Sequence, residues 1–152
     1  MTSNVKRIAA WVFALYCLLM LWLLFGRPGY DPSVPYVRQL KYNLIPFETI
    51  GRFLRLLDAS SSGLRTHAVI NLAGNVIMFI PLGFFPPLLW PKLRRLWKTL
   101  LLCAGIIAAV EGLQLLTLVG SCDTDDLLLN LPGAAIGYGL FRLITKKQSP
   151  DR

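Results

Sequence analysis

Four long apolar segments dominate this chain and limit what it can fold into. They cover residues 8–25, 69–90, 100–119 and 127–144. Each is close to the roughly 20 helical residues that cross about 30 Å of hydrocarbon. The chain is 55% hydrophobic and 16% charged, whereas about a quarter of the residues in a soluble domain are charged. The sequence therefore predicts an all-α membrane protein, a bundle of four transmembrane helices in a single domain over residues 1–152.

Basic residues flank these segments and predict the orientation of the chain. Lys6 and Arg7 precede the first segment, residues 92–98 lie in the short second loop, and residues 142–152 end the chain. Short positive loops stay in the cytoplasm, so both termini are predicted to be cytoplasmic. Residues 26–66 also carry cations, but long loops indicate orientation poorly. The net charge of +8 needs no nucleic acid to explain it, because positive-inside loops and anionic lipid suffice.

The first segment begins like a secretory signal, but two features favour a retained helix. Its apolar run is longer than a typical signal core, and the residues after it, Gly26, Arg27 and Pro28, do not form a small-residue cleavage site.

The loop between the first two segments contains one predicted short helix. Glycine and proline exclude regular structure over much of residues 26–45. Apolar residues over 46–57 then recur at helical spacing, with Pro46 at the first position and charged residues on the other face. We expect an amphipathic helix at the outer membrane interface. It is either a lid or lipid contact over a site, or an element that returns the chain to the membrane.

Polar groups within and beside the apolar segments predict a site at one end of the bundle. Helix direction places them all toward the outer leaflet, and charged groups are costly in hydrocarbon unless they serve a function or have a partner. The candidate polar site comprises Asn71, Asn75, Glu111, Gln114, Asp123, Asp125, Asp126 and Asn130.

Structural explanations compete with a functional site. Asn and Gln side chains often join membrane helices, and an Asp at a helix start is favoured by the helix dipole. Glu111 is the hardest to explain in this way, and Arg65 or His67 are its candidate partners. Close helix contacts are expected at small residues, which here are Gly133 and Gly137, together with Gly74, Gly105, Gly112 and Gly139.

The three cysteines do not indicate a disulfide or a metal site. Cys17 and Cys103 lie in apolar segments and Cys122 lies in an outer loop. Their number and spacing suit neither a disulfide framework nor a zinc site, so no metal is assigned and no cofactor is indicated.

Several short motifs make the chain resemble the VanZ-like family of bacterial membrane proteins over about residues 40–140. These motifs are Asn43-Leu44-Ile45-Pro46-Phe47, Asn71-Leu72-Ala73-Gly74-Asn75, Phe79-Ile80-Pro81-Leu82-Gly83, Glu111-Gly112-Leu113-Gln114, and Asp123-Thr124-Asp125-Asp126 with Asn130, Gly133, Gly137 and Tyr138. The resemblance implies a multi-pass protein of the bacterial cytoplasmic membrane and a link to resistance against teicoplanin, a lipoglycopeptide that acts outside the membrane. Many members carry an Arg before the Asp-rich turn, where this chain has Val119, Gly120, Ser121 and Cys122.

Three functions remain open from the sequence. The leading hypothesis is a site that binds or modifies an amphiphile at the outer leaflet: a membrane lipid, a cell-wall precursor or a lipoglycopeptide. The second is a metal-dependent membrane enzyme that acts on lipid head groups, with a cation held by Glu111, Asp123, Asp125 and Asp126. The third is a small transporter made by oligomerisation, because one chain of four helices has little room for a pore.

Overall fold

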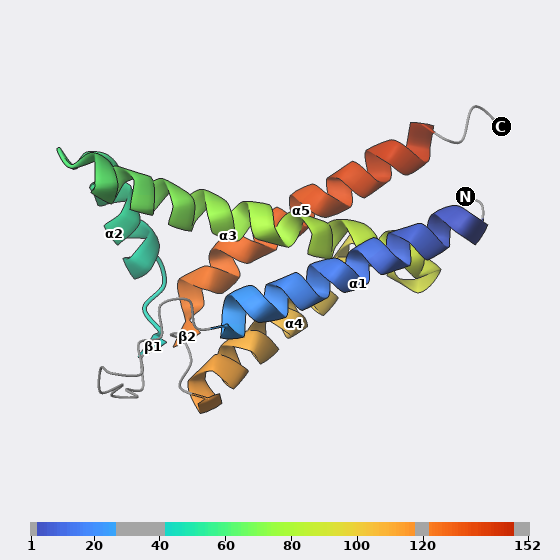
Figure 1. The fold of residues 1–152 in the computed structure, drawn as a ribbon, viewed down its shortest axis with the longest axis horizontal. Helices are drawn as coiled ribbons and strands as arrows, with labels where there is room; N and C mark the ends of the chain where they lie inside the picture. Colours follow the sequence, from blue (N-terminus) through green and yellow to red (C-terminus); the bar gives the residue numbers. More distant parts are fainter. Residues whose placement is uncertain (1–2, 27–41, 118–121, 148–152) are drawn as a thin grey trace.

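A computed structural model describes residues 3–26, 42–117 and 122–147 (Figure 1). The helices are α1 (Ser3–Phe25), α2 (Glu48–Leu57), α3 (Ser62–Leu89), α4 (Leu96–Thr117) and α5 (Thr124–Lys147), with a 3-10 turn at Pro91–Leu93. Two strands of two residues each, β1 (Tyr42–Asn43) and β2 (Cys122–Asp123), form a parallel pair. Most of the loop expected at 26–45, and the predicted end of the third segment at residue 119, lie outside the described residues.

Four of these helices, α1, α3, α4 and α5, are long and apolar enough to cross a membrane. The predicted all-α architecture with four transmembrane helices is therefore confirmed, and the protein is a multi-pass membrane protein. The helices begin earlier than the apolar segments do: α3 starts at Ser62 rather than 69, and α5 starts at Thr124 rather than 127. Their first turns are polar, and Asp125 and Asp126 in the first turn of α5 suit the helix dipole.

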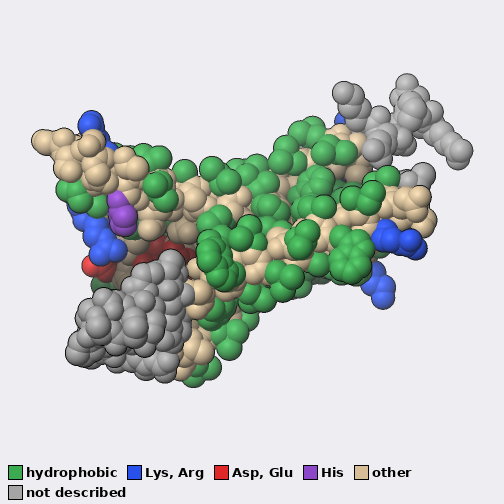
Figure 2. Space-filling model, in the orientation of Figure 1, with side chains coloured by type: hydrophobic (Ala, Val, Ile, Leu, Met, Phe, Trp, Pro, Cys, Tyr) green, Lys and Arg blue, Asp and Glu red, His purple; other side chains and the backbone are tan. Residues whose placement is uncertain are grey.

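The helices place the predicted polar residues at one end of the bundle. In Figure 1, α1 ends, α4 ends and α5 begins near β1 and β2, and α2 lies beside the start of α3 at the same end. The start of α1 and the end of α5 lie together at the opposite end. Figure 2 shows hydrophobic side chains over much of the surface between these ends, as expected of helices that face lipid.

Close contact between α3 and α5 forms the centre of the bundle, where the two helices cross (Figure 1). A Cβ at Gly133 would overlap the carbonyl oxygen of Val76, and a Cβ at Gly137 would overlap that of Ile80. From α3, a Cβ at Gly83 would overlap the carbonyl oxygen of Ala134. The predicted contacts at Gly133 and Gly137 are therefore confirmed.

The same prediction is wrong for four other glycines. A Cβ added to any of them would meet no atom within 4 Å beyond its own helix backbone, so they are not close contact positions; they are Gly74, Gly105, Gly112 and Gly139. Each lies on a helix that contacts its neighbours through a different face.

Helix α1 and the end of α5 are attached by side-chain hydrogen bonds to backbone. The Tyr16 hydroxyl donates to the Met78 carbonyl oxygen at 2.8 Å, which holds α1 against α3. The Tyr138 hydroxyl donates to the Arg94 carbonyl oxygen at 2.7 Å, which holds α5 against the turn between α3 and α4. The buried core between these contacts consists of Met20, Phe79, Leu82, Cys103, Ile107 and Ala134.

The short helix α2 is present as predicted, but it begins at Glu48 rather than at Pro46. Phe47 occupies the N-cap position with a left-handed backbone conformation, φ 66°. Phe53, on the apolar face of α2, is buried, and its ring centroid lies 5.5 Å from that of His67 on α3. The apolar face of α2 therefore packs on the protein, while the location of α2 at a membrane interface stays a prediction.

Candidate functional site

The β1–β2 pair brings two distant segments together at the polar end of the bundle. Tyr42 pairs with Cys122 and Asn43 pairs with Asp123. This parallel pair was not predicted, because two-residue strands have no detectable alternation in sequence. It joins the Asn43–Phe47 motif to the Asp123–Asp126 motif, so that the two motifs form one site.

Asp123 is the centre of this site. One of its carboxylate oxygens accepts a hydrogen bond from the Thr49 hydroxyl at 2.6 Å, and the other accepts from the Asn43 amide at 3.4 Å and the Asp125 backbone N–H at 2.9 Å. The Asn43 amide also donates to the Thr49 hydroxyl at 3.0 Å. The Asp123 side chain is buried, and both of its carboxylate oxygens have hydrogen-bond donors from the protein.

Asp125 attaches α2 to α5. Its side chain is 0% exposed, and its carboxylate accepts hydrogen bonds from the backbone N–H groups of Phe47 at 2.6 Å and Ile50 at 2.9 Å. These groups belong to the start of α2, where helices leave N–H groups without internal partners. A carboxylate on α5 therefore caps α2 from outside and fixes the left-handed Phe47.

Glu111 and Asp126 complete an acidic cluster with Asp123 and Asp125. The Glu111 carboxylate accepts the backbone N–H of Asp123 at 2.9 Å, rather than pairing with Arg65 or His67. The Asp126 carboxylate accepts from the Asn75 amide on α3 at 3.0 Å. The structure thus brings together five predicted site residues, Asn75, Glu111, Asp123, Asp125 and Asp126.

The other three predicted residues are placed differently. The Gln114 amide donates to the Leu24 carbonyl oxygen at 3.2 Å, so it joins α4 to α1. Asn130 lies one turn after Asp126 on α5; it is 4% exposed, and its Oδ1 has no hydrogen-bond partner among the described residues. Asn71 is half-buried on α3, one turn before Asn75.

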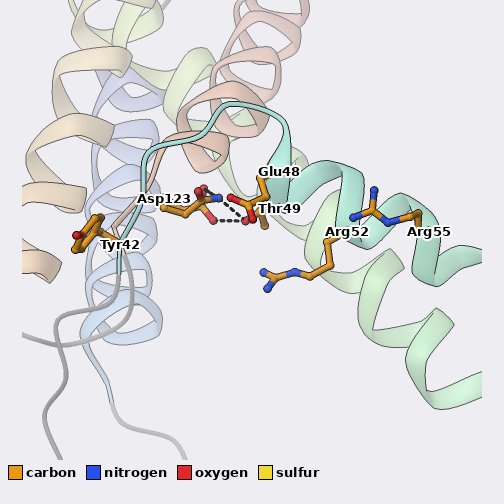
Figure 3. Close-up of a pocket in the computed structure, with 7 residues that line it drawn as sticks. Tyr42, Glu48, Thr49, Arg52, Arg55 and Asp123 are labelled. Atoms are coloured by element: carbon orange, nitrogen blue, oxygen red, sulfur yellow. Dashed lines mark hydrogen bonds between the residues drawn. The ribbon is translucent and has the colours of Figure 1, made fainter.

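A pocket of about 410 Å³ opens beside Asp123 (Figure 3). Figure 3 shows Asp123 hydrogen-bonded at one side, with the side chains of Arg52 and Arg55 extending from α2 on the other. Both arginines and Glu48 are exposed. The residues that line the pocket are Tyr42, Asn43, Glu48, Thr49, Arg52, Arg55 and Asp123.

Most of these lining residues were not predicted as site residues. Arg52 and Arg55 are among the charged residues that the sequence predicts on the polar face of α2, but the sequence indicates no partner for them across a pocket. Thr49 carried a signal that could have found it, because it is a polar residue close to the apolar face of an amphipathic helix. Asn43 belongs to a recognised motif, but its contact with Asp123 depends on a strand pair that the sequence does not reveal.

The grouping and the contacts of the acidic side chains bear on whether the cluster could bind a metal ion. Among residues 3–26, 42–117 and 122–147, no three His, Cys, Asp or Glu side chains are grouped so that they could hold a metal ion. The Asp123 and Asp125 carboxylates instead accept hydrogen bonds from protein N–H and O–H groups. These hydrogen bonds join β2 and α5 to the start of α2.

The pKa of the Cys122 thiol depends on the charge of the nearby acidic cluster. Burial raises the pKa of its thiol, and the nearby Glu111, Asp123 and Asp126 carboxylates raise that pKa further. A raised thiol pKa leaves less thiolate at a given pH, and thiolate is the reactive form.

We therefore expect alkylation of Cys122 to reach half its maximal rate at a higher pH than alkylation of a free cysteine. Glu111→Gln should lower this midpoint, because it removes one negative charge and retains an acceptor for the Asp123 N–H. Glu48→Gln is the matched control. Mass spectrometry of alkylated peptides across a pH series measures both, and an unchanged midpoint in Glu111→Gln would contradict the expectation.

Comparisons with known proteins agree with this description. The family model described as VanZ/LLP1 matches residues 13–145. A protein named Protein VanZ from Enterococcus faecium is 26% identical over 148 residues, which is 97% of this chain and 81% of that protein. No solved structure matches the chain.

Proposed function

The chain belongs to the VanZ/LLP1 family, and from this premise we propose that it binds the polar head of an amphiphile at the outer face of the bacterial cytoplasmic membrane. The observation that carries the proposal is the charged pocket of about 410 Å³ at the polar end of the bundle. Volumes in this range are typical of pockets that bind small molecules or parts of them.

Apolar side chains next to the pocket support an amphiphilic ligand. Leu44, Ile45 and Phe47 lie within four residues after the pocket residue Asn43 and are 65%, 64% and 65% exposed. Exposed apolar residues beside charged ones are characteristic of protein surfaces that lie at the boundary of head groups and acyl chains. A ligand with a charged head and an apolar tail matches both features.

The acidic cluster supports the pocket from within. Asp125 fixes the start of α2, and Asp123 fixes Asn43 and Thr49. The pocket therefore presents preformed groups on α2 and β1, and a preformed site loses less entropy when a ligand binds. In this role Glu111, Asp123, Asp125 and Asp126 position the binding residues.

The outer-face orientation rests on the distribution of basic residues. Six of them lie in the described residues at the start of α1 and around the turn between α3 and α4, away from the pocket: Lys6, Arg7, Lys92, Arg94, Arg95 and Lys98. Basic residues in short flanking segments favour the cytoplasmic side. The pocket would then face the outside, where a lipid, a cell-wall precursor or a lipoglycopeptide of the teicoplanin type is present.

Binding of teicoplanin to the purified full-length chain in lipid nanodiscs tests this function. We expect saturable binding that weakens by about tenfold or more in the Arg52→Gln, Arg55→Gln double variant, because a charge-assisted hydrogen bond contributes about 1.5–3 kcal/mol. Arg65→Gln is the matched control, since Arg65 is exposed on α3 and does not line the pocket. Cells that express the chain should gain teicoplanin resistance, and the double variant should lose that gain at equal abundance. Equal binding by the wild type and the double variant would contradict the pocket as the site.

A further inference from the structure

We propose that the pocket selects a zwitterionic head group in which a phosphate diester lies next to a primary ammonium, the chemistry of phosphoethanolamine lipids. This inference rests on the proposed function and names the class of its ligand. Its basis is the sign and position of the charges on α2 and β2.

The charged residues of α2 lie on one face in a fixed order. Glu48, Arg52 and Arg55 are separated by four and three residues, so they project from the same side of the helix. Glu48 is at the start of α2, and the two arginines follow toward its end. Each residue adds a rise of about 1.5 Å along the helix axis. The acidic end of the pocket at Glu48 is therefore separated along α2 from the basic end at Arg52 and Arg55.

The two arginines suit a phosphate group. A guanidinium offers paired N–H donors whose geometry matches phosphate oxygens. Arg52 and Arg55 are both exposed, and Figure 3 shows their side chains extending from α2 at the pocket. Each guanidinium can donate to the unesterified oxygens of a phosphate diester.

The opposite end of the pocket suits an ammonium. The Asp123 oxygens already accept hydrogen bonds from Thr49, Asn43 and a backbone N–H, so Asp123 contributes mainly its charge. Glu48 is exposed and can accept directly from an ammonium N–H. A primary ammonium carries three donors, whereas a quaternary ammonium carries none.

Charge balance favours a zwitterionic ligand over a purely anionic or purely cationic one. The pocket lining carries two arginines and two carboxylates, which gives a formal charge of zero. A purely anionic head would meet Glu48 and Asp123 within a volume of about 410 Å³, and a purely cationic head would meet both arginines. Like charges brought this close repel one another, so a zwitterion is the ligand whose two charges are both matched.

Lipid titration of the purified full-length chain in detergent tests the selectivity. The probes are phosphatidylethanolamine, phosphatidylcholine and phosphatidylglycerol with identical acyl chains, measured by native mass spectrometry. We expect phosphatidylethanolamine to bind about tenfold more tightly than the other two, the change expected for one charge-assisted hydrogen bond. Glycerophosphoethanolamine, which has no acyl chains, should compete weakly if the ligand is a membrane lipid, and as strongly as the lipid if a soluble phosphoamine is bound.

Two variants test the acidic end and the basic end of the pocket separately. Glu48→Gln should remove the preference for phosphatidylethanolamine over phosphatidylglycerol, and Arg52→Gln with Arg55→Gln should weaken binding of all three lipids. Asp58→Asn, at the exposed end of α2, should change neither.

The outcomes distinguish this inference from the proposed function. Saturable binding without a head-group preference would overturn the zwitterion and keep the amphiphile site. Absence of saturable binding by any lipid or by teicoplanin would overturn both. An equal loss for all three lipids in Glu48→Gln, with α2 less helical, would show that Glu48 only stabilises the helix and would also overturn the selectivity.

Discussion

Replacing Gly137 with alanine is expected to disrupt the contact between α3 and α5 and to lower the amount of folded protein. The new Cβ would overlap the Ile80 carbonyl oxygen and approach the Phe84 backbone nitrogen at 3.0 Å. Both are backbone atoms, so no side-chain rotation relieves the clash and the two helices must separate. Overpacking of this kind costs about 1–3 kcal/mol, occasionally more. Unfolding of the purified protein in mixtures of mild detergent and dodecyl sulfate, followed by circular dichroism, measures the loss.

Gly139 provides the matched control on the same helix. A Cβ at Gly139 meets no atom within 4 Å beyond its own helix, so Gly139→Ala should leave the unfolding midpoint unchanged or raise it slightly. Gly133→Ala, against the Val76 carbonyl, should resemble Gly137→Ala. Equal stability of the Gly137 and Gly139 variants would contradict the structure of the α3–α5 crossing.

The glycines of α5 also show how far the sequence alone predicts the fold. Helix number and approximate position follow from apolar length, which is a local property that the membrane imposes. The Gly133–Gly137 spacing is a recognisable contact pattern, and the contact is confirmed. The rotation of each helix about its axis has no such signal, so Gly74 and Gly139 could not be told apart from Gly133.

The sequence predicts where in the bundle the candidate site lies, but it does not predict the contacts between the site residues. Helix directions put the polar groups at one end, and five of the eight meet there. Their partners come from far along the chain: Phe47 and Ile50 donate to Asp125 from 78 and 75 residues away. These donors are backbone N–H groups, which every sequence has, so no residue pattern predicts them. The pocket depends on these contacts, and that is why its arginines were not recognised.

Asp125→Asn is expected to release α2 from α5. The amide retains one acceptor, but its NH₂ group would face a backbone N–H that now has no partner. A hydrogen bond to a charged group contributes about 1.5–3 kcal/mol, and a buried donor without a partner adds a cost of similar size. Asp125 is 0% exposed, so water cannot replace the lost acceptor without opening the site. We expect a loss of about 3 kcal/mol in the local stability of α2, with Asp125→Ala at least as severe.

Hydrogen exchange of the backbone over residues 47–57 measures this loss directly. Exchange in α2 should accelerate by about a hundredfold, since roughly 1.4 kcal/mol corresponds to a factor of ten, while exchange in the middle of α3 stays slow. Asp58→Asn is the control, because Asp58 is exposed at the end of α2. The Asp125 variants should also lose teicoplanin binding, since Arg52 and Arg55 are positioned by α2. Protected α2 amides in Asp125→Ala would show that other contacts, such as Phe53 against His67, hold this helix.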